Sequence, residues 1–168
     1  MPTPIRNWMI FGAALALCAG AMAALVCARR QSGRGVQDPL PQPLLIEARG
    51  RGREWQFTYG GGDGVLGSAD DVVTRRHFRV PAGAEVLIQL RSDDYLYVFS
   101  CPDLGLKEIA VPDLSYQIRF SPRAPGAHEL AMDPVCGFRL PPGENMGSLI
   151  VTSERDFRSW FAQLEASR

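Results

Sequence analysis

The chain has 168 residues with 18 basic and 18 acidic side chains, so its formal net charge at pH 7 is zero. This balance excludes the strongly basic surface that nucleic-acid binding requires, and no long run of one sign indicates a strongly charged partner. Hydrophobic residues make up 46% of the chain, enough for one globular domain, while 17 glycines and 13 prolines favour turns and strands over a helical bundle.

An uncharged and mostly apolar segment runs from Trp8 to Ala28. About twenty such residues are what a helix needs to span a bilayer core of about 30 Å. We therefore predict a membrane anchor within residues 1–30, although Arg6 and the Ala21-Met-Ala23 pattern would also suit a cleavable signal peptide. More arginines follow the span than precede it, and by the positive-inside rule this favours a cytoplasmic C-terminal part.

Residues 31–43 are rich in Pro, Gly and polar side chains and are predicted to form a linker, followed by a folded domain over residues 44–168. Short apolar or alternating runs follow one another in this domain between Pro and Gly. Such a pattern is typical of an all-β sandwich. The predicted strands cover residues 44–48, 54–59, 77–80, 85–90, 95–99, 116–120, 128–131 and 148–151.

A short C-terminal helix closes the predicted fold. Ser153 can cap it, with Asp156 three residues further on. Four apolar side chains then recur at helical spacing, so we expect this face to pack on the sandwich. They are Phe157, Trp160, Phe161 and Leu164.

Four motifs occur in a fixed order between residues 54 and 163. They are Trp55-Gln-Phe-Thr-Tyr59, Phe78-Arg-Val-Pro-Ala-Gly83, the segment Ser92–Lys107, and the loop Pro125–Gly137 followed by Met146-Gly-Ser-Leu-Ile-Val151. In sequence and order they resemble cytochrome c oxidase subunit II. The resemblance implies a cupredoxin-like Greek-key β-sandwich, held outside the membrane by the N-terminal transmembrane helix, beside a haem-copper oxidase core.

The metal-binding loop of that family reads C-x-E-x-C-G-x-x-H-x-x-M, and with a histidine upstream it holds the dinuclear copper A centre. In this chain Tyr97 stands at the position of the first histidine, Met132 at that of the first cysteine and Pro134 at that of the glutamate. Cys136 is retained, and Met146 could match the methionine. The candidate positions for the second histidine, Leu140 and Gly143, are not histidines.

These departures predict that the dinuclear centre is lost. Copper A requires two bridging thiolates and terminal imidazoles, and one cysteine with one methionine cannot supply them. Arg53 occupies the position of the family's surface tryptophan, at which cytochrome c delivers its electron. Docking of cytochrome c is therefore not expected either.

The cysteines at 101 and 136 leave three interpretations open. An even pair in an exported domain suggests a disulfide, and strand alternation would turn Cys101 and Tyr97 toward the same side as the loop. Two unrelated buried thiols are the second interpretation. The third is a remodelled mononuclear copper site built from Cys136, Met132 and Met146, with His128 and Cys101 as further soft or borderline donors.

The remaining candidates have simpler structural interpretations. His128 is expected to be a core or strand histidine, His77 a surface or hydrogen-bonded residue, and the two methionines core residues. The loop with Asp63, Asp70 and Asp71 could bind a hard cation such as calcium, but its spacing differs from that of an EF-hand, and an acidic hairpin loop is the preferred interpretation. No nucleophile with a neighbouring base is visible.

The sequence therefore predicts a membrane-anchored, subunit II-like protein of a haem-copper respiratory oxidase or a related complex. Its role would be structural and non-catalytic, with a multi-span subunit I-like partner and no resident cofactor. The globular domain would lie on the extracytoplasmic, periplasmic side of the cell membrane, as the resemblance implies and in conflict with the positive-inside rule. The alternative is a cupredoxin that transfers electrons or binds copper at a remodelled mononuclear site.

Overall fold

The structure is a computed structural model that describes residues 42–167. The predicted anchor and all but the last two residues of the predicted linker lie outside this range. Among the helices of residues 42–167, none combines the length and the apolar character needed to cross a membrane.

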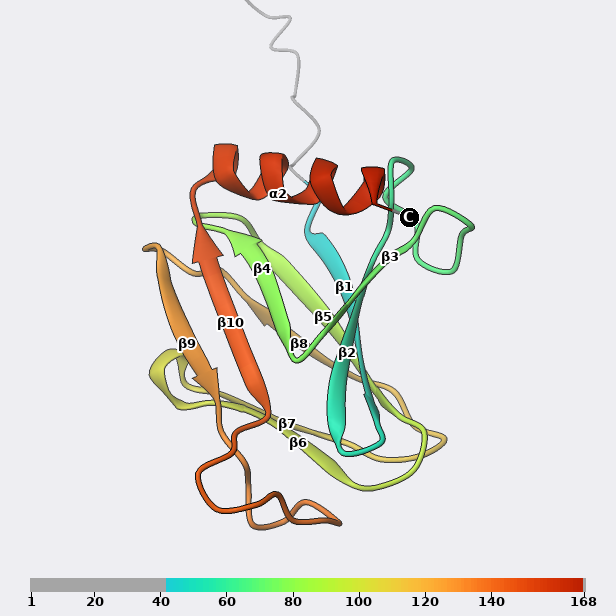
Figure 1. Ribbon diagram of the computed structural model, residues 1–168, viewed down its shortest axis with the longest axis vertical. Coiled ribbons are helices and arrows are strands. Elements are labelled where there is room, and N and C mark those ends of the chain that lie inside the picture. The colour runs from blue at the N-terminus through green and yellow to red at the C-terminus, as the bar shows by residue number, and fades with distance from the viewer. Residues whose placement is uncertain (1–41, 168) are drawn as a thin grey trace, which may run out of the picture. The chain divides into compact units, whose positions relative to one another are not determined.

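The described residues form ten β-strands, a 3-10 turn and a C-terminal helix (Figure 1). The strands are β1 (Leu44–Arg51), β2 (Glu54–Tyr59), β3 (Val72–Arg75), β4 (His77–Pro81), β5 (Val86–Ser92), β6 (Tyr97–Cys101), β7 (Leu106–Ala110), β8 (Tyr116–Phe120), β9 (Gly126–Leu130) and β10 (Gly147–Thr152). The turn η1 covers Pro102–Leu104, and the helix α2 covers Glu154–Ala166.

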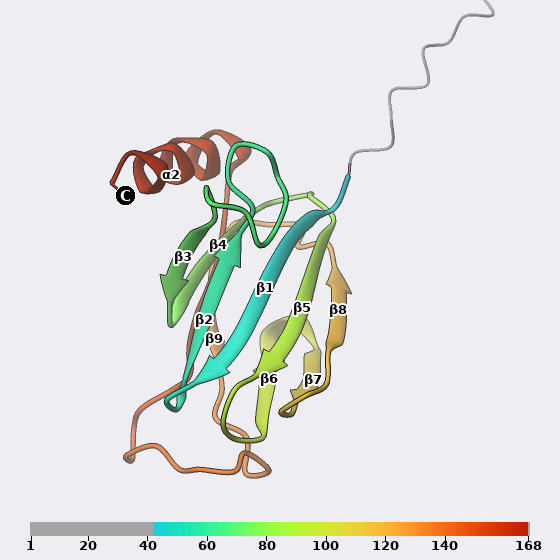
Figure 2. The same ribbon diagram turned by 90° about the vertical axis from the view of Figure 1, so that its right-hand side faces the viewer.

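These strands pair into three sheets. A five-stranded sheet has the order β3-β2-β1-β5-β8, a three-stranded sheet the order β4-β10-β9, and β6 pairs with β7. Figure 2 shows the five-stranded sheet facing the viewer, with β4 and β9 behind it. The pairs β1 with β5 and β4 with β10 are parallel, whereas the other strand pairs are antiparallel.

The core lies between the five-stranded and three-stranded sheets. Burial alternates along β1 and β2, so that every second side chain turns inward, as period-two alternation predicts. Phe57 of β2 stacks on Phe78 of β4 with ring centroids 4.1 Å apart, which joins the two sheets. Every strand predicted from the sequence overlaps an observed strand, which confirms the mostly-β fold class. The strands β3 and β7 were not predicted.

The C-terminal helix is also confirmed. Ser153 is its N-cap, and the Ser153 side chain accepts a hydrogen bond from the Asp156 N–H at 3.2 Å. The helix lies across one end of the strands in Figure 1. Its aromatic face packs on Tyr59 of β2, with ring centroids 5.6 Å from Trp160 and 5.7 Å from Phe161.

The end of the domain opposite α2 is formed by the β5–β6 connection, residues 93–96, and by the long β9–β10 connection, residues 131–146 (Figure 1). We call it the loop end. The β1–β2 hairpin also turns there, at Gly52 and Arg53, whose φ angles are 62° and 69°. Positive φ at both central residues is what a type I′ hairpin turn requires.

The approach of β1 to β6 at the loop end leaves no room for a side chain at position 50. An ideal Cβ on Gly50 would lie 2.4 Å from Cδ2 of Tyr97, a ring that is itself completely buried. We therefore expect Gly50→Ala to lower the free energy of unfolding by about 2–3 kcal/mol, the upper range for overpacking a core. Urea unfolding followed by tryptophan fluorescence measures this change.

Two variants accompany that measurement. Gly62→Ala is the matched control, because a Cβ there would meet only a carboxylate oxygen of Asp70 at 3.7 Å. Combining Gly50→Ala with Tyr97→Leu should cost less stability than the sum of the two single changes, since Tyr97→Leu removes the ring that the new methyl group meets. If the losses of stability from the two single changes simply add in the double variant, the proposed clash is contradicted.

Candidate functional site

The loop end brings the predicted site residues into one region by pairing a loop with a buried strand. All five residues of β6 are buried. The Ala131 N–H donates to the Ser100 carbonyl at 2.9 Å, and the Gly137 N–H donates to the Leu96 carbonyl at 2.8 Å. Residues 131–137 therefore run alongside β6, and Cys136 lies near the Tyr97 end of that strand.

Tyr97 occupies the centre of this region and is completely buried. Its hydroxyl donates to Oδ1 of Asp94 at 2.8 Å and accepts the Arg53 N–H at 2.9 Å. The other carboxylate oxygen of Asp94 accepts the Gly52 N–H at 2.7 Å. The phenol thus connects β6, the β5–β6 connection and the β1–β2 turn.

The same environment keeps the Tyr97 hydroxyl protonated. Burial raises the pKa of Tyr97 well above its ordinary value, and the adjacent Asp94 carboxylate raises it further. A neutral phenol that is already bonded to two protein groups is a poor substitute for an imidazole ligand.

Aromatic rings surround Tyr97. Phe138 of the β9–β10 connection lies 4.8 Å from it and Trp55 of β2 lies 5.2 Å from it, measured between ring centroids. Phe138 also contacts Tyr95 at 5.6 Å. We call these four residues the aromatic cluster. Phe138 was missed from the sequence, although an aromatic residue two positions after Cys136 was a visible signal.

The predicted sulfur ligands differ in exposure. Cys136 and Met146 are buried, with 4% and 1% of their surfaces exposed, whereas Met132 is half-buried. Pro134, at the position of the family's glutamate, is exposed. Within residues 42–167, no group of three or more His, Cys, Asp or Glu side chains is arranged to hold a metal ion.

This donor set does not fit a dinuclear copper A centre. Two bridging thiolates are required, and Cys136 is the one cysteine in the loop. The Tyr97 oxygen at the first histidine position is committed to Asp94 and the Arg53 N–H.

Cys101 and Cys136 are both free thiols in the structure, so the disulfide considered from the sequence is not formed there. Cys101 ends β6, whereas Cys136 precedes Gly137, which is bonded to Leu96. The strand from Leu96 to Cys101 spans about 16 Å at about 3.3 Å per residue. Disulfide-bonded cysteines have Cα atoms at most about 7 Å apart, so this pairing would require the loop to move.

Asp133 secures the start of the loop. Its carboxylate lies 2.8 Å from Nζ of Lys107 on β7 and accepts the Val135 N–H at 2.9 Å. These hydrogen bonds lower the pKa of Asp133, the one to Lys107 most strongly. The Asp133 carbonyl also accepts the Cys136 N–H at 3.1 Å. Neither Asp133 nor Lys107 was expected from the sequence, because their pairing joins separate elements.

The two histidines have partners in the strands and turns. His128 on β9 places Nδ1 3.4 Å from Oδ2 of Asp103 in η1, and His77 on β4 places Nδ1 2.9 Å from the Ser148 hydroxyl. These contacts agree with the interpretation of His128 as a strand histidine and of His77 as a hydrogen-bonded residue.

The acidic loop before β3 bonds to its own backbone. Oδ1 of Asp63 accepts the Val65 N–H at 2.8 Å, and Oδ2 of Asp71 accepts the Gly67 N–H at 2.7 Å. Asp70 accepts the Asp63 N–H at 3.3 Å. This pattern supports the interpretation of a hairpin loop whose carboxylates replace missing backbone acceptors.

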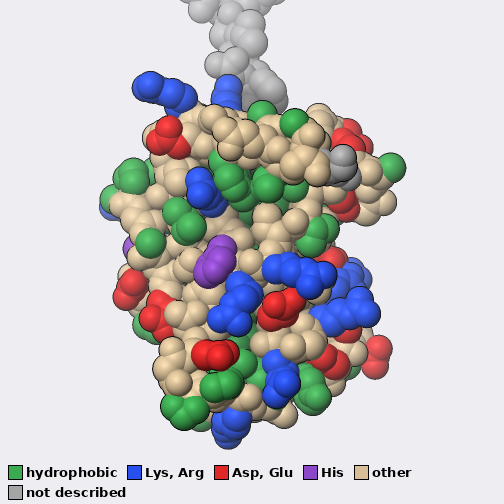
Figure 3. All heavy atoms as spheres, in the orientation of Figure 1, with side chains coloured by type: hydrophobic (Ala, Val, Ile, Leu, Met, Phe, Trp, Pro, Cys, Tyr) green, Lys and Arg blue, Asp and Glu red, His purple; other side chains and the backbone are tan. Residues whose placement is uncertain are grey.

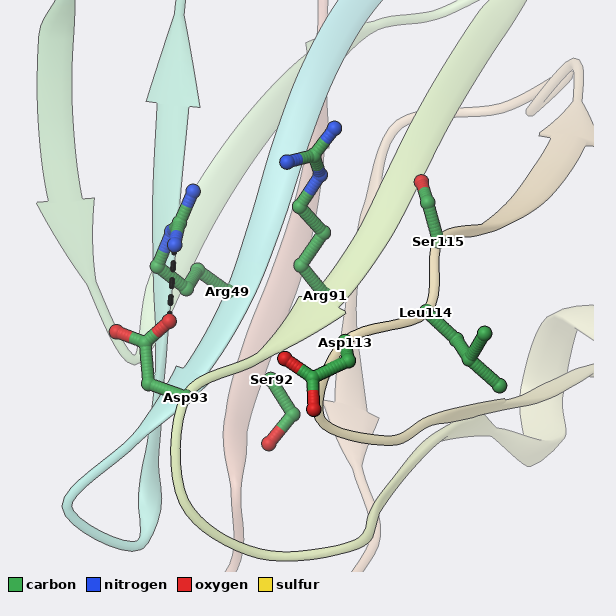
Figure 4. A pocket seen from close by; sticks show the side chains of 7 residues that line it. All are labelled: Arg49, Arg91, Ser92, Asp93, Asp113, Leu114 and Ser115. Carbon is green, nitrogen blue, oxygen red and sulfur yellow. Dashed lines mark hydrogen bonds and ion pairs between the residues drawn. The ribbon is translucent and has the colours of Figure 1, made fainter.

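A cavity of about 300 Å³ lies apart from the predicted site residues (Figure 4). Its wall contains two arginines from neighbouring strands, and Arg49 donates to Asp93 at 2.8 Å. The lining residues are Arg49, Arg91, Ser92, Asp93, Asp113, Leu114 and Ser115. Acidic and basic side chains are also interspersed on the face drawn in Figure 3, in keeping with the neutral net charge.

Comparison with known proteins agrees with the motifs. No family model matches the chain. Cytochrome c oxidase subunit 2 of Thermostichus vulcanus is 26% identical over 131 residues, which cover 78% of this chain and 36% of that protein. Alternative cytochrome c oxidase subunit 2 of Bradyrhizobium diazoefficiens is 26% identical over 140 residues, covering 70% of this chain and 50% of that protein.

The chain thus spans between about a third and a half of the length of these curated relatives. Among solved structures, the periplasmic domain of cytochrome oxidase subunit II from Bradyrhizobium japonicum superposes with a TM-score of 0.59 at 16% identity, covering 76% of this chain and 97% of that domain. Fold, motif order and sequence relatives together show that the chain contains a cytochrome c oxidase subunit II-like cupredoxin domain.

Proposed function

We propose that this protein is a membrane-anchored, subunit II-like component of a haem-copper respiratory oxidase or a related complex. Its domain acts outside the cytoplasm as a structural part of the complex, without a dinuclear copper A centre. The observation that carries the proposal is Tyr97, which fills the first histidine position with a buried ring and a fully bonded hydroxyl.

Protein contacts take over the connections that a metal centre would provide. In a copper site the ions link the loop to the strand beside it, and here the rings of Phe138 and Tyr97 make that link. Buried aromatic pairs contribute about 0.5–1.5 kcal/mol beyond the burial of their surface. Asp133 and Lys107 add a link between the loop and β7. The loop end is therefore organised without bound metal.

The β1–β2 turn supports the proposal that the domain does not take part in electron transfer from cytochrome c. Arg53 is exposed and carries a positive charge at the position where the family has its docking tryptophan. An arginine is not an aromatic electron acceptor, and its charge repels a cationic donor surface. The domain would thus not receive electrons from cytochrome c.

The association with an oxidase core is tested by affinity purification of the tagged full chain from its native membrane in mild detergent. We expect a multi-span, haem-binding subunit to be recovered with it in near-equimolar amount. Recovery of the chain alone, under conditions that keep other respiratory complexes intact, would contradict the proposed role.

Two exposed valines provide a matched pair for the same experiment. Val135 is 61% exposed at the loop end, and Val65 is 58% exposed in the acidic loop near α2. If the loop end faces the partner, Val135→Asp should reduce recovery of the partner subunit while Val65→Asp should not, because a charge is costly in a desolvated interface. Equal recovery of the partner subunit with both variants would show that the loop end does not face the partner.

The alternative of a mononuclear copper site rests on the buried Cys136 and Met146, with Met132 beside Asp133 in the loop. Sulfur donors of this kind favour reduced copper. Our proposal predicts that the full chain, loaded with copper and desalted, retains only substoichiometric metal and shows no thiolate charge-transfer band. Cys136→Ser should leave the metal content unchanged.

Stoichiometric copper that is lost in Cys136→Ser would favour the electron-transfer alternative instead. Cys101→Ser serves as the matched control, since it removes the other buried thiol of the domain at the far end of β6. Counting free thiols in the same samples checks that both cysteines stay reduced.

The ion pair of Asp133 with Lys107 predicts a pH dependence. Because the pKa of Asp133 is lowered in the folded protein, the carboxylate stabilises the fold at pH values above its ordinary pKa of 3.8. This contribution is lost as the pH falls through the lower, folded pKa. Asp133→Asn should therefore be less stable than the original protein at pH 7, and the difference should shrink below about pH 4.

Urea unfolding between pH 7 and pH 3 measures this effect. Asp113→Asn is the control, because Asp113 is an exposed aspartate in the β7–β8 connection whose left-handed backbone, with φ of 66°, also suits asparagine. A stability difference for Asp133→Asn that stays constant down to pH 3 would show that the ion pair does not hold the loop.

A further inference from the structure

The aromatic cluster forms a continuous path from the surface of the loop end into the core. Tyr95 begins it and is 43% exposed. Its ring lies 5.6 Å from Phe138, which lies 4.8 Å from Tyr97, which in turn lies 5.2 Å from Trp55. Tyrosine and tryptophan are the side chains in this path that can lose one electron.

Tyr97 has the partner that such an oxidation requires. Loss of an electron makes a phenol strongly acidic, so the reaction is favourable only where the proton can leave at the same time. The Tyr97 hydroxyl already donates to Oδ1 of Asp94 at 2.8 Å, within the range for proton transfer to a general base. Asp94 is exposed, so it can pass the proton on to solvent.

Trp55 lacks such a partner. Its indole Nε1 is buried and has no hydrogen-bond partner among the residues that the structure describes. An oxidised Trp55 would therefore remain a buried cation, which is costly in an apolar surrounding. The adjacent Tyr97 can release its proton and become a neutral radical, so an oxidising equivalent that reaches either ring should settle on Tyr97.

We propose that Tyr97 is a redox-active tyrosine, with Asp94 as its proton acceptor, in a path that carries one-electron oxidising equivalents between Trp55 and the surface at Tyr95. This activity belongs to the domain itself and does not depend on the proposed role in an oxidase.

The step is balanced as follows. A strong one-electron oxidant, such as a peroxide-derived radical, accepts one electron from the Tyr97 phenol. The O–H bond of Tyr97 breaks and the proton bonds to the Asp94 carboxylate, which leaves a neutral phenoxyl radical beside a carboxylic acid. A one-electron reductant in solvent, such as ascorbate, returns the electron, and the proton returns from Asp94 or water.

Flash oxidation of the full chain in detergent tests the proposal. A photo-oxidised ruthenium polypyridyl complex serves as the oxidant, and transient absorption with electron spin resonance identifies the radical. In the original protein we expect a neutral tyrosyl radical whose formation is slower in deuterated water. Asp94→Asn keeps one carbonyl oxygen that can accept from the Tyr97 hydroxyl, gives up the acceptor of the Gly52 N–H and removes the base, so it should slow radical formation by about 100-fold.

In a Tyr95→Phe background, which removes the exposed tyrosine of the path, Tyr97→Phe should abolish this tyrosyl signal and leave a tryptophan radical cation in its place. Tyr116→Phe is the control, since Tyr116 is a half-buried tyrosine of β8 outside the aromatic cluster, and it should leave the signal unchanged. If Tyr97→Phe does not fold, the rate of radical formation in Asp94→Asn tests the proposal by itself. A radical that forms equally fast in Asp94→Asn, or that persists in a folded Tyr97→Phe, would overturn the proposal.

Discussion

The buried hydroxyl of Tyr97 is the constraint on which the loop end depends. Burying a hydroxyl without a partner costs about 1–3 kcal/mol, so the surrounding segments must supply both a donor and an acceptor. The Arg53 N–H and the Asp94 carboxylate do so. Satisfying one phenol thereby fixes the β1–β2 turn, the β5–β6 connection and β6 relative to one another, and Phe138 then has a defined surface to pack on.

A second buried and fully hydrogen-bonded tyrosine hydroxyl lies at the opposite end of the domain. Tyr59 is completely buried below α2, and its hydroxyl donates to the Arg79 carbonyl and accepts the Arg79 N–H, both at 2.9 Å. Burial raises the pKa of Tyr59 far above its ordinary value. Two neutral phenols therefore join β2 to β4 at one end and β6 to the β1–β2 turn at the other. Neither connection changes its charge within the physiological pH range.

Sequence patterns predicted what depends on local periodicity and missed what depends on contacts across elements. Alternation identified β1 and β2, and the cap at Ser153 identified the start of α2. The short strands β3 and β7 have few buried side chains and so gave no alternating signal. Alternation also indicates which face a side chain takes but not its position along the strand, which is why a Cys101–Cys136 disulfide stayed among the open interpretations although the two residues lie near opposite ends of β6.

The proposed absence of a copper A centre would change what assembly of the domain depends on. Metal binding that organises a loop is coupled to folding, so a domain of that kind reaches its final form only after loading. Here, the equivalent links are side-chain contacts that form as the chain folds, with Phe138 on Tyr97 and Asp133 on Lys107. Under the proposed function, a subunit built in this way would be complete without a supply of copper, and its contribution to a complex would rest on shape and surface.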